Sequence, residues 1–264
     1  MKIILFSVLL TVITLQASDL PSDSKGRTPV LVELFTSEGC SSCPPADELL
    51  GKLDQQPIPG EDLIVLSEHV DYWNHEGWKD PYSAHFYSDR QGVYAERLGL
   101  SEPYTPQMIV DGSSQFVGSD AALAQKAFAK ALADPKVGVR LSSVSIGSNN
   151  VLLAHLETDA LLPSLGMRDA DVYVVVALNR AESQVSRGEN AGHKLSHTAV
   201  VKSMTKIGTL RKGKTFGQDL QLKLDPGTDA SNVRVIAFLQ EPGQGRVIGA
   251  AEEQTVSAGA HAQQ

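Results

Sequence analysis

The chain has 264 residues, a formal net charge of −8 and 42% hydrophobic residues. An acidic chain without a basic cluster is a poor partner for nucleic acid or an anionic membrane surface, so we expect it to bind neither. The length suits two medium domains or one large one, and two cysteines are too few for a fold held by disulfide bonds.

The first 17 residues have the pattern of a secretory signal peptide. Lys2 precedes an apolar run over 3–15, and Ala17 is a small residue of the kind that signal peptidase requires. The run is short for a membrane-spanning helix. Cleavage near Ala17 removes one Lys and no acid, which changes the net charge from −8 to −9. It leaves a periplasmic or secreted protein without an integral membrane segment. An uncleaved anchor or a buried first helix is the alternative.

The next part of the chain predicts alternating strands and helices. Residues 18–28 are mostly small and polar and predict a flexible lead-in. The elements expected over 29–135 are, in chain order, strand 29–35, helix 46–53, strand 62–70, loop 71–83, helix 85–98, strands 107–110 and 115–117, and a helix from Ser119 or Asp120 to Ala133. Asp134-Pro135 ends this first domain.

Residues 136–257 predict a second, all-β domain. Strands are expected over 137–146 (with a bulge), 151–156, 171–178, 220–224, 233–239 and 246–251. Many short strands without a strong helix are typical of a β-sandwich. The tail over 258–264 is small and polar, which predicts disorder.

Both cysteines lie in one C-S-S-C motif, Cys40 to Cys43, between the first strand and the first helix. Unpaired N–H groups and the helix dipole stabilise a thiolate at a helix start. The position predicts a redox-active pair in which Cys40 is the exposed nucleophile and Cys43 the resolving thiol. Pro44 and Pro45 remove N–H groups that favour the thiolate. An inert disulfide and a metal site are the alternatives.

Residues 29–135 resemble the thioredoxin superfamily in the strand–CSSC–helix unit, the element order and Thr105-Pro106 before the third strand. The resemblance implies that Pro106 is a cis-proline against the disulfide and that Thr105 docks an extended substrate chain; a trans turn proline is the alternative. It also implies a proton-relay role for Glu33, an acid that is costly to bury in an apolar strand. Its spacing to Cys40 is one residue longer than in thioredoxins, and an outward-facing strand residue is the alternative.

Five segments carry a more specific resemblance. They are VELFTSEGCSSCPPAD, HVDYWN, GWKDPYS, PYTPQMIVDG and RGENAGHKLSH. These are similar to the domain-of-unknown-function family 1223, which comprises secreted or periplasmic thioredoxin-like proteins of bacteria. The resemblance covers nearly the whole mature chain. It implies a fold and a compartment but no substrate, since the family has no assigned reaction.

The loop over 71–83 is rich in aromatic and polar residues and follows His69. One hypothesis is a copper or zinc site made from the cysteines with His69 or His75. The preferred interpretation is a loop that shields the disulfide, with Trp73 in contact with the substrate, because histidines without ligand spacing are weak evidence for a metal.

A second loop, residues 187–192, places Glu189 and Asn190 between two glycines. Such a loop is conformationally constrained. We expect it to fold back against the cysteine site and to supply Glu189 and Asn190 as substrate contacts. A bulged β-connection is the alternative.

The sequence therefore predicts an α/β thioredoxin-like domain followed by an all-β, sandwich-like domain. The predicted function is an exported thiol–disulfide oxidoreductase that acts on protein or small-molecule thiols and disulfides without cofactor or metal. The predicted catalytic residues are Cys40, Cys43, Pro106, Thr105 and Glu33; the predicted substrate contacts are Thr105, Trp73, Glu189 and Asn190. A binding or assembly module with a static disulfide and a copper or zinc carrier are the alternatives. No sequence pattern indicates the oligomeric state.

Overall fold

The computed structural model describes residues 27–55, 60–147 and 149–255. The predicted signal peptide, nearly all of the lead-in and the predicted disordered tail lie outside the described residues.

The elements of the first part follow the sequence prediction closely. They are β1 (Thr28–Thr36), α1 (Pro44–Gln55), β2 (Glu61–His69), the short helix η1 (Asn74–Glu76), α2 (His85–Leu98), β3 (Gln107–Val110), β4 (Ser114–Val117) and α3 (Ala121–Ala131). Of the two expected cap residues, Ser119 and Asp120, the structure selects Asp120, whose carboxylate accepts the N–H of Leu123 at 2.9 Å.

The second part is built from strands and two short helices. They are β5 (Val139–Ile146), β6 (Val151–Thr158), η2 (Pro163–Leu165), β7 (Ala170–Gln184), β8 (Lys194–Leu210), β9 (Gly217–Lys223), η3 (Ala230–Asn232), β10 (Val233–Gln240) and β11 (Val247–Gln254). The bulge predicted in β5 lies between Ser142 and Ser145. The sequence pattern predicted only about half of β7, which has 15 residues. It set no bounds for β8, which has 17 residues.

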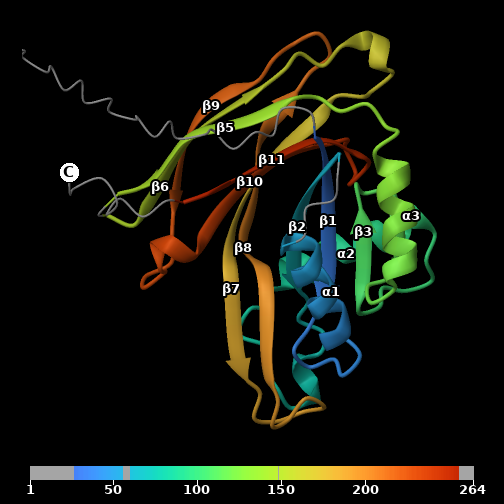
Figure 1. Ribbon diagram of the computed structural model, residues 1–264, viewed down its shortest axis with the longest axis vertical. Helices are drawn as coiled ribbons and strands as arrows, with labels where there is room; N and C mark the ends of the chain where they lie inside the picture. The colour runs from blue at the N-terminus through green and yellow to red at the C-terminus, as the bar shows by residue number, and fades with distance from the viewer. Residues whose placement is uncertain (1–26, 56–59, 148, 256–264) are drawn as a thin grey trace, which may run out of the picture.

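The predicted fold class, a thioredoxin-like domain followed by a β-sandwich, is wrong. Strands of both parts form one mixed eight-stranded sheet in the order β11-β10-β7-β8-β2-β1-β3-β4 (Figure 1). The junction is the parallel pair of β2 and β8, where Ser67 is opposite Val200. The remaining strands form a three-stranded sheet, β5-β6-β9. Long strands β7 and β8 extend the second part into the sheet of the first, and no local pattern in the sequence shows such a pairing.

The large sheet is covered on both faces. Side chains alternate along β1, so Val32 and Leu34 pack with α1 and α3, whereas Leu31 and Phe35 pack with α2 side chains on the other face. Figure 1 shows α1 and α3 on the near face and α2 behind the sheet. The three-stranded sheet packs on β7, β10 and β11 through a separate apolar cluster that includes Leu156.

Candidate functional site

The structure joins Cys40 and Cys43 by a disulfide bond in the turn between β1 and α1. Their Cα atoms lie 5.4 Å apart. The N–H groups of Ala46 and Asp47 donate to the Cys43 carbonyl at 2.8 and 3.1 Å. The pair therefore stands at the N-terminus of α1, where the sequence places it.

Both cysteines are fully buried, with 0% of each exposed. The expectation that Cys40 is exposed is therefore wrong for the disulfide state. The hydroxyl of Ser42 lies 3.4 Å from Cys40 Sγ. A disulfide sulfur carries no hydrogen, so Ser42 is the donor of this contact.

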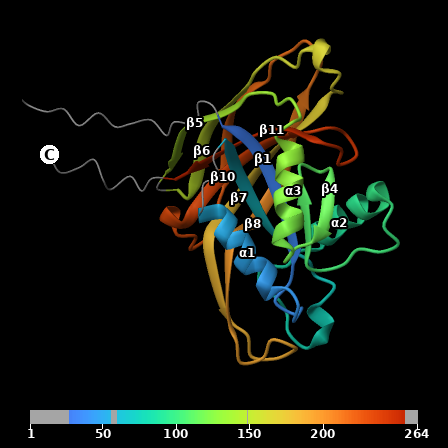
Figure 2. The same cartoon turned by 45° about the vertical axis from the view of Figure 1, so that its right-hand side comes forward.

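The tip of the β7–β8 hairpin, residues 185–193, covers the cysteine loop. Glu189 Oε2 accepts the N–H of Ser41 at 3.0 Å. Hydrogen bonding from the side chain and the backbone of Ser41 lowers the pKa of Glu189. The amide of Asn190 donates to the carbonyls of Glu38 and Cys40 at 2.9 and 3.0 Å. Figure 2 shows the tip at the end of the molecule where α1 begins. The contacts confirm that residues 187–192 fold back onto the cysteines; a substrate role for Glu189 and Asn190 stays a prediction.

The hairpin tip also packs on η1. A Cβ added at Gly188, whose φ is +74°, would lie 3.1 Å from the Glu76 carbonyl and 3.3 Å from the Trp78 Cβ. The two loops approach so closely because Gly188 has no side chain and tolerates a positive φ. Together they enclose the disulfide from the solvent side.

Thr105, Pro106 and Trp73 lie together. The indole of Trp73 donates to Thr105 Oγ1 at 2.7 Å. The Thr105–Pro106 peptide bond is cis, as the resemblance implies. A Cβ added at Gly39 would lie 3.0 Å from Trp73 Cβ, so Trp73 packs against the residue that precedes Cys40. Their docking roles stay predictions.

A buried ionic network lies beside the disulfide. His197 of β8, 3% exposed, places Nε2 3.2 Å from Glu38 Oε1 and Nδ1 3.6 Å from Asp47 Oδ1. Burial alone would lower the pKa of His197, but the carboxylates of Asp47 and Glu38 outweigh it and raise the pKa to about 10. His197 is therefore an imidazolium at neutral pH. Thr36 Oγ1 donates to the other Asp47 oxygen at 3.2 Å.

The network extends to the loop after β2. His69 Nδ1 lies 2.7 Å from Asp80 Oδ2, which also accepts the N–H of Glu38 at 2.9 Å. Burial would raise the pKa of Asp80, but His69 and the backbone N–H groups lower it. The indole of Trp78 donates to Glu38 Oε2 at 2.7 Å. Trp78 directly, and His69 through Asp80, thus hold Glu38, the acid two positions before Cys40.

The structure does not bring Glu33 to the cysteines. Glu33 is fully buried on the face of β1 opposite α1. It accepts hydrogen bonds from Arg90 Nε at 2.7 Å and from the Tyr94 hydroxyl at 2.6 Å. Burial and the charge of Glu33 raise the pKa of nearby Glu68 well above its usual range. Glu33 thus belongs to a buried cluster with α2.

The family model described as "Protein of unknown function (DUF1223)" matches residues 31–240. The chain belongs to this family. The predicted resemblance to family 1223 is therefore confirmed. No curated protein matches the chain.

Two solved structures resemble this family member along most of its length. A protein from Agrobacterium tumefaciens is 28% identical, with 86% of this chain and 94% of its own covered and a TM-score of 0.66. HBP35 of Porphyromonas gingivalis is 18% identical, with 90% and 79% covered and a TM-score of 0.63. At this identity the second likeness shows the fold alone.

No sequence pattern assigned a role to Glu38, Asp47 or His197. Asp47 lies four residues after Cys43, and an acid at that spacing from a helix-start cysteine was the available signal. His197 had no signal, because only the β2–β8 junction brings it beside α1.

Within 27–55, 60–147 and 149–255, no group of three or more His, Cys, Asp or Glu side chains is arranged to hold a metal ion. No helix of this part is long and apolar enough to cross a membrane.

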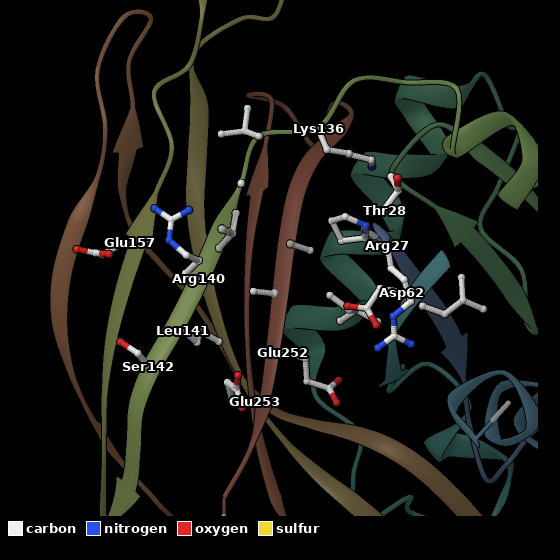
Figure 3. Close-up of a pocket in the computed structure, with 18 of the residues that line it drawn as sticks. Arg27, Thr28, Asp62, Lys136, Arg140, Leu141, Ser142, Glu157, Glu252 and Glu253 are labelled. Carbon is white, nitrogen blue, oxygen red and sulfur yellow. The ribbon is translucent and has the colours of Figure 1, made fainter. Parts of the chain in front are cut away.

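Of two clefts in the structure, one lies away from the predicted site residues and the other is lined by residues of the ionic network beside the cysteines. One of about 1000 Å³ lies among β5, β11 and the starts of β1 and β2, and Figure 3 shows Arg140, Glu252 and Asp62 around it. No predicted site residue lines it. A second, of about 390 Å³, lies between α1 and β8 and is lined by Asp47 and His197.

Proposed function

We propose that this protein is an exported thiol–disulfide oxidoreductase whose Cys40–Cys43 pair exchanges with thiols or disulfides of a partner. The disulfide at the start of α1 supports the proposal, because the helix dipole stabilises a thiolate there. The signal-peptide pattern of the first 17 residues supports export, and disulfides persist in oxidising compartments.

The observation that carries the proposal is a buried carboxylate oxygen one helical turn after Cys43. Asp47 Oδ1 makes no hydrogen bond within the described part of the chain, and the charged His197 Nδ1 lies 3.6 Å away. This ion pair is longer than a hydrogen bond, so the oxygen keeps an acceptor site unused. In the disulfide state Cys43 has no proton to offer. Reduction creates a thiol at Cys43, one helical turn before Asp47 on α1, and we assign the proton of that thiol to Asp47 Oδ1.

The exchange balances in two steps. The Cys40 thiolate attacks one sulfur of a partner disulfide; a mixed disulfide forms, and the second partner sulfur leaves as a thiolate. Asp47 takes the proton of Cys43, and the Cys43 thiolate attacks Cys40 Sγ. The Cys40–Cys43 bond forms and the first partner sulfur leaves. The pair loses two electrons and the partner gains them; the reverse sequence oxidises a partner dithiol.

Because both sulfurs are buried, exchange requires the hairpin tip to withdraw. The tip is held on the cysteine loop by three hydrogen bonds, two from Asn190 and one to Glu189. Each is worth about 1 kcal/mol, so a partner that competes for them opens the site at modest cost.

A trapping experiment tests the proposal. The Cys43→Ser variant cannot resolve a mixed disulfide, so it accumulates partners linked through Cys40, whereas Cys40→Ser accumulates none. A redox titration of the wild type accompanies it. A chain that traps no partner and reduces no model disulfide is not an oxidoreductase.

The complete burial of both cysteines favours one other candidate, a binding or assembly module with a static disulfide. In that case the reduction potential lies below about −300 mV, as in structural disulfides. Cys40 then resists alkylation after mild reduction. The same titration separates the two candidates.

A further inference from the structure

The two helices that cover one face of the large sheet leave a groove between them. Figure 2 shows α1 and α3 on the near face of the sheet. The groove has a volume of about 400 Å³. It is lined from α1 by Leu49, Lys52 and Leu53, from α3 by Ala121, Ala124, Gln125 and Phe128, and from the start of β2 by Glu61.

The small residues of α3 explain why the groove exists. Ala121, Ala124 and Phe128 recur at helical spacing, so they lie on one face of α3. The two alanines end at a methyl group and leave space toward α1, whereas Phe128, only 1% exposed, forms the floor. On α1, Leu49 and Leu53 lie one turn apart and are only half-buried. The groove therefore presents apolar side chains that the two helices do not bury against each other.

The groove also holds a carboxylate without a partner. Glu61 is only 8% exposed, and its Oε2 makes no hydrogen bond within the described residues. Burial raises the pKa of Glu61, and no neighbouring charge offsets the effect. Lys52 is the one cation among the lining residues that the structure describes, and its Nζ pairs with Glu48 Oε1 at 2.6 Å instead. A buried acceptor without a donor is costly, so a molecule that brings a donor to Glu61 gains free energy.

We infer that the α1–α3 groove binds a small cationic amphiphile, with an apolar body between the two helices and an ammonium group paired with Glu61. Small-molecule sites are mostly apolar, with a few polar groups that fix the orientation of the ligand, and the volume lies in their range. An ammonium group supplies both hydrogen-bond donors and the opposite charge, and charge-assisted hydrogen bonds are the stronger kind. The inference does not depend on the proposed cysteine chemistry, because neither cysteine lines the groove.

The first test titrates isotope-labelled wild-type protein with three probes that share one apolar body: 4-phenylbutylamine, 4-phenylbutanol and 4-phenylbutyrate. We expect the amine to shift the NMR amide signals of Leu53 and Phe128 until they saturate. The alcohol keeps the apolar contacts but lacks the charge, so its dissociation constant is about tenfold higher. The acid binds more weakly still, because its carboxylate meets the like charge of Glu61. Equal dissociation constants for the three probes, or no saturable shift of the groove signals, overturn the inference.

A second test removes the charge of the groove. Glu61→Gln keeps the shape of the side chain, and we expect it to weaken binding of the amine about tenfold while the alcohol stays within about twofold of wild type. Asp62→Asn is the matched control. Side chains alternate along a strand, so Asp62 points to the other face of β2, and it lines the cleft at β5 and β11 instead. A loss of the same size for both probes in Glu61→Gln, or no loss for the amine, contradicts the pairing with Glu61 and overturns the inference.

A third test fills the groove and leaves Glu61 in place. Ala121 is exposed, so the fold tolerates Ala121→Leu, and we expect this variant to bind both the amine and the alcohol about tenfold more weakly. Ala122→Leu is the control, because Ala122 is also exposed on α3 and does not line the groove. Amine binding that survives Ala121→Leu unchanged overturns the inference. A concentration-dependent dimer that shifts the same signals without any probe assigns the groove to a second copy of the chain and also overturns it.

Discussion

The imidazole Nδ1 of His197 on β8 lies 3.6 Å from Oδ1 of Asp47 on α1. The contact joins the second part of the chain to the helix that begins at the cysteines. Glu38 contacts the other ring nitrogen at 3.2 Å, and the ring of His69 packs edge-on with centroids 4.6 Å apart. The disulfide therefore has a buried, ionised neighbour that neither part supplies alone.

Because the carboxylates hold the pKa of His197 at about 10, against 6.5 in an unfolded chain, its protonation stabilises the fold. The contribution is complete below about pH 6.5 and is lost as the pH rises through about 10. We expect His197→Gln to lower the free energy of unfolding by about 3 kcal/mol at neutral pH, because it leaves buried carboxylates unpaired. The difference from wild type shrinks toward pH 10 in urea titrations. His193→Gln, an exposed histidine of the same hairpin, shows no such trend. An NMR titration that finds His197 neutral at pH 8 contradicts the prediction.

Asp47→Asn removes the proposed proton acceptor and keeps the volume of the side chain. We expect resolution of the mixed disulfide to slow about 100-fold at neutral pH, the size of a general-base effect. The loss becomes smaller as the pH approaches about 8.5, where a free thiol ionises unaided. Stopped-flow kinetics over this pH range measure it. Glu48→Gln, an exposed acid one residue further on, is the control. A uniform loss at every pH indicates a structural role instead.

Asn190→Ala removes two hydrogen bonds that hold the hairpin tip on the cysteine loop. At about 1 kcal/mol each, their loss raises the open population at least tenfold. We expect faster reduction of the disulfide by a phosphine and faster alkylation of Cys40 afterwards. Asn232→Ala removes two side-chain hydrogen bonds to the backbone of Arg180 and serves as the control. Equal rates in all three proteins show that the tip does not limit access.

Glu33→Gln separates the relay role implied by the resemblance from the buried cluster seen here. Arg90 is buried and loses the carboxylate that it hydrogen-bonds, while Glu68 stays 3.6 Å from its Nε, so we expect a loss of about 3 kcal/mol in unfolding free energy. The exchange rate of the folded protein stays within about twofold of wild type, because no step of the mechanism uses Glu33. A large loss of rate with unchanged stability restores the relay.

The sequence by itself determined the local features: the strands and helices of the first part, a cap for α3 at Ser119 or Asp120, the bulge in β5 and the cysteines at a strand-to-helix turn. Hydrophobic periodicity, turn residues and helix caps act over a few neighbouring residues, so they can be recognised in one amino-acid sequence. Only the tertiary structure decided that Ser67 meets Val200, and with that contact came one shared sheet in place of two domains. It also decided that His197 meets Asp47 and that Asn190 covers Cys40, 150 positions away. Such contacts depend on which strands become neighbours in the sheet. The alternation of side chains along a strand does not identify its neighbour, because the alternation is the same whichever strand pairs with it.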